Sequence, residues 1–229
     1  MLSTNIEGTT YERCFLASFP NTIPFSETFG FIADVDDSDE GGNDFAFVVT
    51  AHEIAHQWWA HQVIGADVLG ATMLSESLSE YVALKVTEEV NGKNKMRKFL
   101  KRSLDTYLTQ RTFETKRENA LMYNDGQGYI HYQKGSLIFY ALSDYIGEKL
   151  LNKTLSNYVK KVAFQSPPYT TSIELVDDLR EVIPDSLKYV IKDMFETITL
   201  YENRVLNTEF KELENGKYQV DLEFRVSKY

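Results

Sequence analysis

Two histidines lie four residues apart, His52 and His56, in the segment A-H-E-I-A-H-Q-W-W. This segment constrains the fold more than any other part of the sequence does. Its apolar and aromatic residues recur at helical spacing, which predicts a helix from Asn43, as N-cap, to about Val63. Residues four apart on a helix lie one turn apart on the same face, so both imidazoles can reach one metal ion. Glu53 lies about 100° farther round the helix, close enough to contact a water on that ion without being a ligand.

This spacing predicts a zinc site that hydrolyses a substrate. Zinc lowers the pKa of water towards ~7, and a neighbouring carboxylate can then take the proton as the water attacks a carbonyl. Glu53 is therefore the predicted general base. The alternative is a chance H-E-x-x-H on a surface helix. Two of only four histidines fall in the motif, and its apolar flanks predict a buried helix, where such a cluster without a metal would be unfavourable.

A hydrolytic zinc site needs a third protein ligand. A metzincin would have a glycine and a histidine at the positions that Trp59 and Gln62 occupy, so that class is excluded. Two carboxylates remain, Asp67 in the connecting loop and Glu76 near the start of the next helix. We prefer Glu76, because a ligand on a facing helix is held more rigidly than one on a loop.

The rest of the chain predicts an α+β protein that is mainly α. Residues 1–42 form a small β portion with two short strands between Tyr11 and Val35, residues 43–200 are helical, and residues 201–229 form a β-hairpin. The predicted elements after the first helix span 73–90, 93–113 and 129–146, with three more helical stretches in 148–199 that start near 148, 171–172 and 184, and a hairpin turn at Asn215-Gly216.

Composition excludes several classes of function. A formal net charge of -10 argues against nucleic acid or an anionic membrane as partner, since both need a basic face. Cys14 is the only cysteine and stands in an apolar stretch, so no intramolecular disulfide and no cysteine protease is predicted, and the redox compartment stays open.

No apolar run has the ~18 to 20 residues of a membrane span, so a soluble chain is predicted. The acidic run at 34–44 reads as a solvated loop, because it lacks the EF-hand glycine and closing glutamate.

At these residues the sequence resembles the aminopeptidase N-like zinc peptidases of the gluzincin group. That family has H-E-x-x-H-x-W and, after eighteen residues, a ligand in L-N-E-G-F; here H-E-I-A-H-Q-W-W is followed by L-S-E-S-L. The gap is one residue longer, and Ser75 occupies the usual ligand position. Because serine does not replace a carboxylate, we place the extra residue in the G-A-D-V-L-G-A-T loop and keep Glu76.

Two more motifs carry the resemblance. H-Y-Q-K-G matches the family's Y-x-K-G, whose tyrosine donates a hydrogen bond to the oxyanion, which implies this role for Tyr132; the alternative is a packed interior tyrosine. P-F-S-E-T-F-G at 24–30 matches G-x-M-E-N-W-G through Glu27 and Gly30, which implies that Glu27 binds the substrate's α-amino group. Here the chain has Pro, Ser and Thr where the family has Gly, Met and Asn, and Glu27 as a surface residue is the alternative.

The resemblance implies a thermolysin-like catalytic domain over residues 1–200, with the hairpin as the start of a truncated β module. It implies one Zn²⁺ and a peptide substrate, cleaved at its N-terminus by an aminopeptidase. An endopeptidase with the same site is one alternative. Another is a non-catalytic sensory or scaffold domain, because A-T-M-L-S-E-S-L also looks like peptidase domains fused to bacterial ABC-transporter permeases, which implies a membrane-tethered parent.

Three further side chains and one basic run remain. Glu80, one turn after Glu76, either orients a ligand histidine through its free ring nitrogen or is solvated. His61 and His131 either line the cleft or, as we prefer, are packed or surface residues. The basic run K-N-K-M-R-K-F-L-K-R is predicted to be a solvated helix face.

Overall fold

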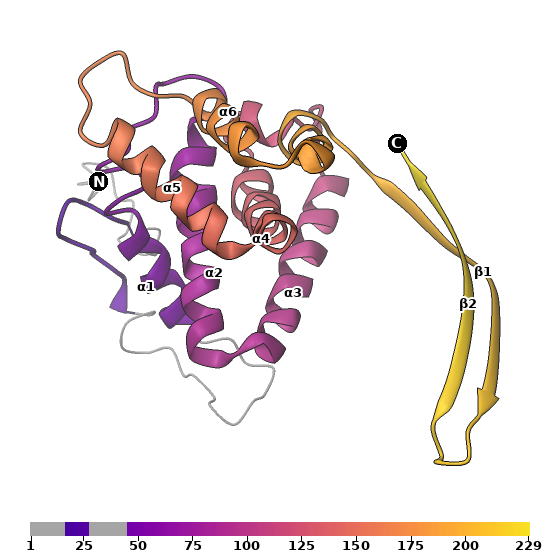
Figure 1. Cartoon of the computed structure of the whole chain (residues 1–229). Coiled ribbons are helices and arrows are strands. Elements are labelled where there is room, and N and C mark those ends of the chain that lie inside the picture. Colours follow the sequence, from indigo (N-terminus) through magenta and orange to yellow (C-terminus); the bar gives the residue numbers. More distant parts are fainter. Residues whose placement is uncertain (1–16, 28–44) are drawn as a thin grey trace.

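The computed structural model describes residues 17–27 and 45–229 of the chain (Figure 1). It is mainly helical and ends in an antiparallel two-stranded hairpin, as the sequence predicted. The elements are α1 (Phe45–Ala55), η3 (Met73–Ser77), α2 (Leu78–Asn91), α3 (Lys93–Thr112), η4 (Leu121–Tyr123), η5 (Tyr129–Lys134), α4 (Gly135–Ile146), α5 (Glu148–Val162), α6 (Ser172–Val182), η6 (Asp185–Leu187), α7 (Lys188–Ile191), η7 (Lys192–Glu196), β1 (Tyr201–Glu212) and β2 (Tyr218–Lys228).

Helix α2 forms the centre of the helical body and contacts α1, α3 and α4. Its Tyr81 packs against Phe139 of α4, with ring centroids 6.0 Å apart, and Phe139 in turn meets Phe195 edge to face at 5.4 Å. All three rings are buried. Large aromatic side chains bury much apolar surface, so this contact holds α2, α4 and the chain after α7 together. The core thereby fixes the helix that follows Glu76.

Helix α1 is shorter than predicted, because it ends at Ala55 and not near Val63. The next residues form turns, with backbone hydrogen bonds from Val63 N to Trp58 O at 2.9 Å, and Ala60 has φ 143°, which no helix allows. The apolar residues after His56 repeat at helical spacing, but the segment that carries them folds back in turns and does not continue the helix. His56 itself still follows the helix, since its N–H donates to the carbonyl of His52 at 3.2 Å.

The later helices agree with the prediction to within about two residues, and α2 ends at Asn91 before Gly92 as expected. Three turns of the described residues are π-helical, and two of them lie at the starts of predicted helices. Met73–Ser77 and Tyr129–Lys134 are π-helical turns at the starts of the predicted second and fourth helices. A π turn holds one residue more than an α turn and occurs often at functional sites. Here these two turns carry Glu76 and Tyr132.

The hairpin of β1 and β2 leads away from the helical body (Figure 1). Its turn has Gly216 at φ 73°, a left-handed conformation that glycine adopts without strain. The register puts Val205 opposite Phe224 and Phe210 opposite Val220, so one face of the hairpin is apolar and the other polar. Both faces are exposed. The hairpin prediction is confirmed, whereas the larger β module stays a prediction.

The described N-terminal segment, residues 17–27, contains an isolated bridge between Phe19 and Thr22 but no named strand. The two strands predicted between Tyr11 and Val35 fall largely on residues that lie outside the described ranges, as do Cys14, Gly30 and the acidic run. Within the described ranges, no helix has the length and apolar character that crossing a bilayer requires.

Candidate metal centre

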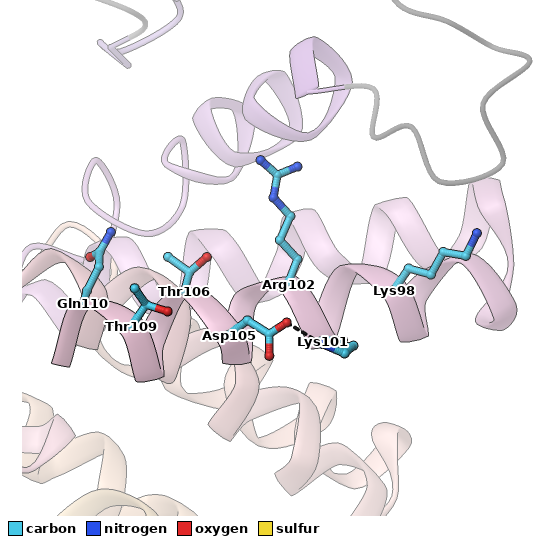
Figure 2. A pocket seen from close by; sticks show the side chains of 7 residues that line it. All are labelled: Lys98, Lys101, Arg102, Asp105, Thr106, Thr109 and Gln110. Atoms are coloured by element: carbon cyan, nitrogen blue, oxygen red, sulfur yellow. Dashed lines mark hydrogen bonds and ion pairs between the residues drawn. The ribbon is translucent and has the colours of Figure 1, made fainter. Parts of the chain in front are cut away.

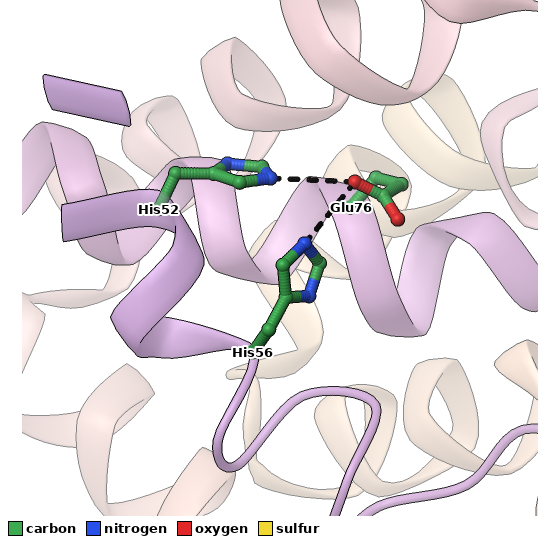
Figure 3. A group of neighbouring side chains, drawn as sticks. All are labelled: His52, His56 and Glu76. Carbon is green, nitrogen blue, oxygen red and sulfur yellow. Dashed lines mark hydrogen bonds and ion pairs between the residues drawn. The ribbon is translucent and has the colours of Figure 1, made fainter. Parts of the chain in front are cut away.

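Three side chains converge on one point between α1 and η3 (Figure 3). Oε2 of Glu76 lies 3.3 Å from Nε2 of His52 and 3.4 Å from Nε2 of His56. His52 comes from α1, His56 from the first turn after it, and Glu76 from the π turn that precedes α2. The donor atoms of the group all lie within 4.8 Å of one another. The structure thus brings together the three residues that the sequence selected as ligands.

The spacing of these atoms fits zinc. Two ligand atoms that each lie about 2.05 Å from a tetrahedral zinc are about 3.3 Å apart, and both carboxylate-to-imidazole distances match this value. Two neutral imidazoles and one carboxylate are also a donor set that zinc uses with water in its fourth position. Asp67, the other carboxylate considered, is exposed and does not belong to this group.

The carboxylate of Glu80 fixes the ring of His52. Its Oε2 lies 2.8 Å from Nδ1 of His52. An ionised carboxylate accepts hydrogen bonds only, so Nδ1 carries the proton and the lone pair of Nε2 is left for the metal. A carboxylate placed in this way orients the ligand and raises its basicity.

A backbone carbonyl does the same for His56. The carbonyl of Trp59 lies 2.9 Å from Nδ1 of His56, and the hydroxyl of Ser79 lies 3.0 Å from it. A carbonyl can only accept, so Nδ1–H is the donor and Nε2 is the ring atom that faces Glu76 and would bind a metal. This contact needs the early end of α1, because in a continuous helix the carbonyl of residue 59 would point away, along the axis towards the C-terminus.

The two glutamates govern the charge of the centre when no metal is bound. Burial lowers the pKa of His52, but its hydrogen bonds with Glu76 and Glu80 outweigh burial and raise the pKa to about 9. Burial raises the pKa of Glu76, but the hydrogen bonds from His52 and His56 bring it well below its usual range. Glu76 is therefore an anion at neutral pH, as a metal ligand must be.

Glu53 follows His52 on α1 and is buried. Burial raises the pKa of its carboxyl group, while the neighbouring charges of His52 and His56 act in the opposite direction. No hydrogen bond or ion pair joins its carboxylate to another residue of the described ranges, and it is not a member of the ligand group. Its carboxyl group is thus close enough to both histidines to feel their charge, as expected of a group beside the metal site.

Tyr132 borders the same centre from the turn η5. Its ring centroid lies 5.8 Å from that of His52. Burial and the nearby carboxylate of Glu76 raise the pKa of the phenol, so Tyr132 stays protonated and can donate a hydrogen bond at neutral pH. The turn is docked on the ligand segment, because the hydroxyl of Ser77, next to Glu76, donates to the carbonyl of His131 at 2.7 Å.

The sequence did not single out Asn124, which contacts His131, the residue before Tyr132. Its Nδ2 contacts Nδ1 of His131 at 3.0 Å and donates to Oγ1 of Thr72 at 2.9 Å. His131 is buried and meets the Tyr132 ring edge to face at 4.3 Å, and burial lowers its pKa. His131 is thus a packed residue, as we preferred from the sequence, and its packing partner is Tyr132. No motif marks Asn124, since its partners are 52 and 7 residues distant.

The segment that carries Glu27 is attached to the end of the histidine helix by Gln57. Nε2 of Gln57 donates to Oγ of Ser18 at 2.8 Å and to the carbonyl of Phe19 at 2.9 Å, and its Oε1 accepts from the Asn21 N–H at 2.8 Å. All hydrogen-bonding groups of this amide except one lone pair are thus used by one short segment. Glu27, six residues farther on, is exposed.

Away from the metal centre, a hollow of about 430 Å³ lies along α3 (Figure 2). It shares no lining side chain with the metal centre. Lys98, Lys101, Arg102, Asp105, Thr106, Thr109 and Gln110 line it. Lys101 pairs with Asp105, and Lys93, Arg97, Lys98, Lys101 and Arg102 are exposed. The basic run is therefore a solvated helix face, as predicted.

Comparison with known proteins assigns the chain to a family. The Peptidase family M1 domain matches residues 22–197, well over half of the chain. The chain belongs to peptidase family M1. The expected resemblance to aminopeptidase N-like zinc peptidases is thereby confirmed, and the group of His52, His56 and Glu76 fits the expected cofactor Zn²⁺.

The relatives are distant and longer. Aminopeptidase M1-B of Oryza sativa subsp. japonica is 24% identical over 158 residues, which are 66% of this chain and 17% of that protein. An M1 zinc metallopeptidase from Deinococcus radiodurans has a TM-score of 0.56 at 19% identity over 79% of this chain and 36% of that one. For leukotriene A4 hydrolase from Saccharomyces cerevisiae the TM-score is 0.50 at 18% identity, and the match covers 66% of this chain and 25% of that protein. This chain therefore spans about a third or less of the relatives it matches.

Proposed function

We propose that this chain is a zinc-dependent aminopeptidase, the catalytic part of which is a thermolysin-like domain over residues 1–200. The observation that carries the proposal is the distance of 3.3 to 3.4 Å from Glu76 Oε2 to the Nε2 atoms of His52 and His56. When bound there, zinc would act as a Lewis acid towards water and the scissile carbonyl.

The other residues of the site then have distinct tasks. Glu53 takes a proton from the attacking water and passes it to the leaving amine, as a carboxylate beside the nucleophile can. The Tyr132 hydroxyl donates a hydrogen bond to the oxyanion of the tetrahedral intermediate, which stabilises charge that is absent from the substrate. Glu80 holds His52 in the tautomer that leaves Nε2 free.

Specificity for a free N-terminus rests on Glu27, whose carboxylate would pair with the α-ammonium group of the substrate. The Gln57 hydrogen bonds support this role, because they attach the segment before Glu27 to the residue that follows His56. A second candidate is an endopeptidase with the same site. It is favoured by the exposure of Glu27, since an exposed carboxylate binds an amine weakly.

The test is hydrolysis of a panel of aminoacyl fluorogenic substrates and short peptides by the zinc-loaded protein. Glu53→Gln should lower kcat by about 10² to 10⁴-fold, the usual effect of losing a general base, while zinc content is unchanged. Acetylation of the N-terminus of a peptide separates the two candidates, because only an aminopeptidase loses its substrate.

One further result would contradict both candidates. The zinc-loaded wild type could be as inactive on the whole panel as Glu53→Gln is expected to be. In that case the chain is a zinc-binding sensory or scaffold domain. Because the relatives are longer, the same panel is run on a longer form of the protein wherever one is encoded. A peptidase then shows Glu53-dependent activity in at least one of the two forms.

A further inference from the structure

Lys134 belongs to the Y-x-K-G motif but does not face the metal centre. Residues two apart in a helical turn point to nearly opposite sides, so Tyr132 and Lys134 face in different directions. Tyr132 faces His52, whereas Nζ of Lys134 donates to Oε1 of Glu118 at 2.6 Å, in the chain between α3 and η4. The two side chains of this ion pair are only 13% and 5% exposed.

Glu118 is the centre of a buried cluster. The Tyr107 hydroxyl donates to its Oε1 at 2.8 Å, and Arg111 donates to Oε2 through Nε. The ammonium group of Lys134 also lies 5.4 Å from the centroid of the Tyr107 ring. Burial raises the pKa of Glu118, but the donors Lys134 and Arg111 outweigh burial and lower it, so the carboxylate is an anion at neutral pH.

A buried ion pair of this kind contributes little to stability, because desolvation offsets much of the attraction. What it does supply is position, since both of its partners are held by several directed contacts. Lys134 is the last residue of the π turn Tyr129–Lys134, and π-helices are rare and occur mostly as single turns of this kind. Such a turn needs side-chain contacts to hold its orientation.

We propose that Lys134 and Glu118 are positioning residues for Tyr132. Their ion pair fixes the rotation of the turn Tyr129–Lys134 about its axis and thereby directs the Tyr132 hydroxyl towards the oxyanion. On the opposite side, the Ser77 hydroxyl holds the carbonyl of His131, so the turn is restrained from two directions. This inference rests on the proposed function, in which Tyr132 is the oxyanion donor.

The experiment is a double-mutant cycle on the zinc-loaded protein with Lys134→Met and Tyr132→Phe, singly and together. Loss of the oxyanion donor lowers kcat by about 10² to 10³-fold. Lys134→Met alone should lower kcat about 10-fold or more with KM nearly unchanged, since a small misplacement of a catalytic group has effects of this size. In the Tyr132→Phe background the same change should alter kcat less than about 2-fold, because no hydroxyl is left to position.

Lys85→Met is the matched control. Lys85 pairs with the buried Glu88, Tyr140 donates to Glu88 at 3.0 Å, and the ammonium group lies 5.3 Å from the Tyr140 ring centroid. This cluster has the same chemistry as that of Lys134 but lies next to no residue of the metal centre. Lys85→Met should therefore change stability as Lys134→Met does, and leave kcat unchanged.

The outcomes are distinguishable. If Tyr132→Phe leaves kcat unchanged, the proposed role of Tyr132 is wrong and the positioning role is wrong with it. If Tyr132→Phe is impaired and Lys134→Met lowers kcat equally in both backgrounds, only the positioning role is wrong. Where Lys134→Met does not fold by circular dichroism, Lys134→Arg is used in the same cycle. It keeps the charge but changes its position, so the same coupling with Tyr132 is expected.

Discussion

Gly135 and Ser77 approach each other so closely that no side chain fits between them. A β-carbon added to Gly135 would lie 2.6 Å from Cβ of Ser77, shorter than any real contact between such atoms. Gly135 follows the turn that carries Tyr132, and Ser77 follows Glu76. The glycine of the Y-x-K-G motif therefore allows the tyrosine turn to dock against the ligand turn.

Gly135→Ala should destabilise the protein by about 1–3 kcal/mol, because the new methyl group forces the two turns apart. The separation moves Glu76 as well, so zinc affinity should fall together with stability. Urea unfolding of the metal-free protein and a zinc titration against a chelator measure the two effects.

Gly128→Ala is the control, since it lies at the other end of the same turn. Its backbone is helical, and an added β-carbon would come no closer than 3.9 Å to the Tyr132 ring. This change should be neutral or stabilising by up to ~1 kcal/mol. Equal destabilisation by both changes would show that any methyl group on this turn is harmful and that the contact with Ser77 has no special part.

The contact between Glu80 and His52 predicts a change in metal affinity. Glu80→Gln keeps the size of the side chain but removes the charge that favours the Nδ1 proton of His52. Loss of such a contact usually lowers metal affinity by about 10 to 100-fold. Competition with a chelator measures the zinc dissociation constant of wild type and variant.

Glu89→Gln is the control for charge, because Glu89 lies on the same helix and is exposed. It should leave the dissociation constant within about 2-fold. An unchanged affinity in Glu80→Gln would mean that Glu80 is a solvated residue of α2 and does not orient His52.

The histidine spacing could be interpreted from the sequence alone, because residues four apart on one helix need no knowledge of the rest of the fold. The contacts of Glu118 could not, since its partners Tyr107, Arg111 and Lys134 are 7 to 16 residues distant and form no periodic pattern. The early end of α1 was also missed. The apolar residues after His56 have helical spacing, and this spacing is the same whether the segment continues the helix or folds back in a turn.

The extra residue before Glu76 shows a further limit of reasoning from the sequence. We placed it in the loop 65–72, where insertions are usually tolerated. The π turn Met73–Ser77 provides another place, because such a turn contains one residue more than an α turn. Turn type depends on how the segment packs, and here its partners are His131 and Gly135, more than fifty residues away.

Zinc binding should release about one proton near pH 7.5. The pKa of His52 in the metal-free protein is about 9, so this histidine is protonated at that pH and must lose its proton to become a ligand. Between pH 7 and about 9 the zinc association constant should rise roughly tenfold per pH unit and then level off. Calorimetry in buffers of different ionisation enthalpy counts the protons, and a count near zero would contradict this account.

The same pKa determines how the stability of the metal-free protein depends on pH. Because the pKa of His52 is raised from 6.5 to about 9 on folding, its contribution to the free energy of unfolding is complete below pH 6.5. It is lost as the pH rises through about 9. In Glu80→Gln this fall in stability should be smaller, since one of the two carboxylates that raise the pKa is gone.

Gln57 offers a test of how the segment before Glu27 is held. Gln57→Leu removes all three hydrogen bonds to residues 18–21, including the acceptor of the Asn21 N–H. Hydrogen exchange at Asn21 should become about tenfold faster or more, because each lost bond contributes ~1 kcal/mol. Gln62→Leu is the control, since Gln62 donates to the carbonyl of Gln57 but to no residue of that segment.

The same variant links the segment to specificity. If Glu27 binds the substrate's α-ammonium group, loosening its attachment should raise KM for peptides with a free N-terminus and leave the zinc content unchanged. N-acetylated peptides, which lack the charge that Glu27 would bind, should show no such increase in any residual hydrolysis. An equal rise in KM for free and acetylated peptides would mean that Gln57 supports the cleft as a whole, and that the site selects no amine through Glu27.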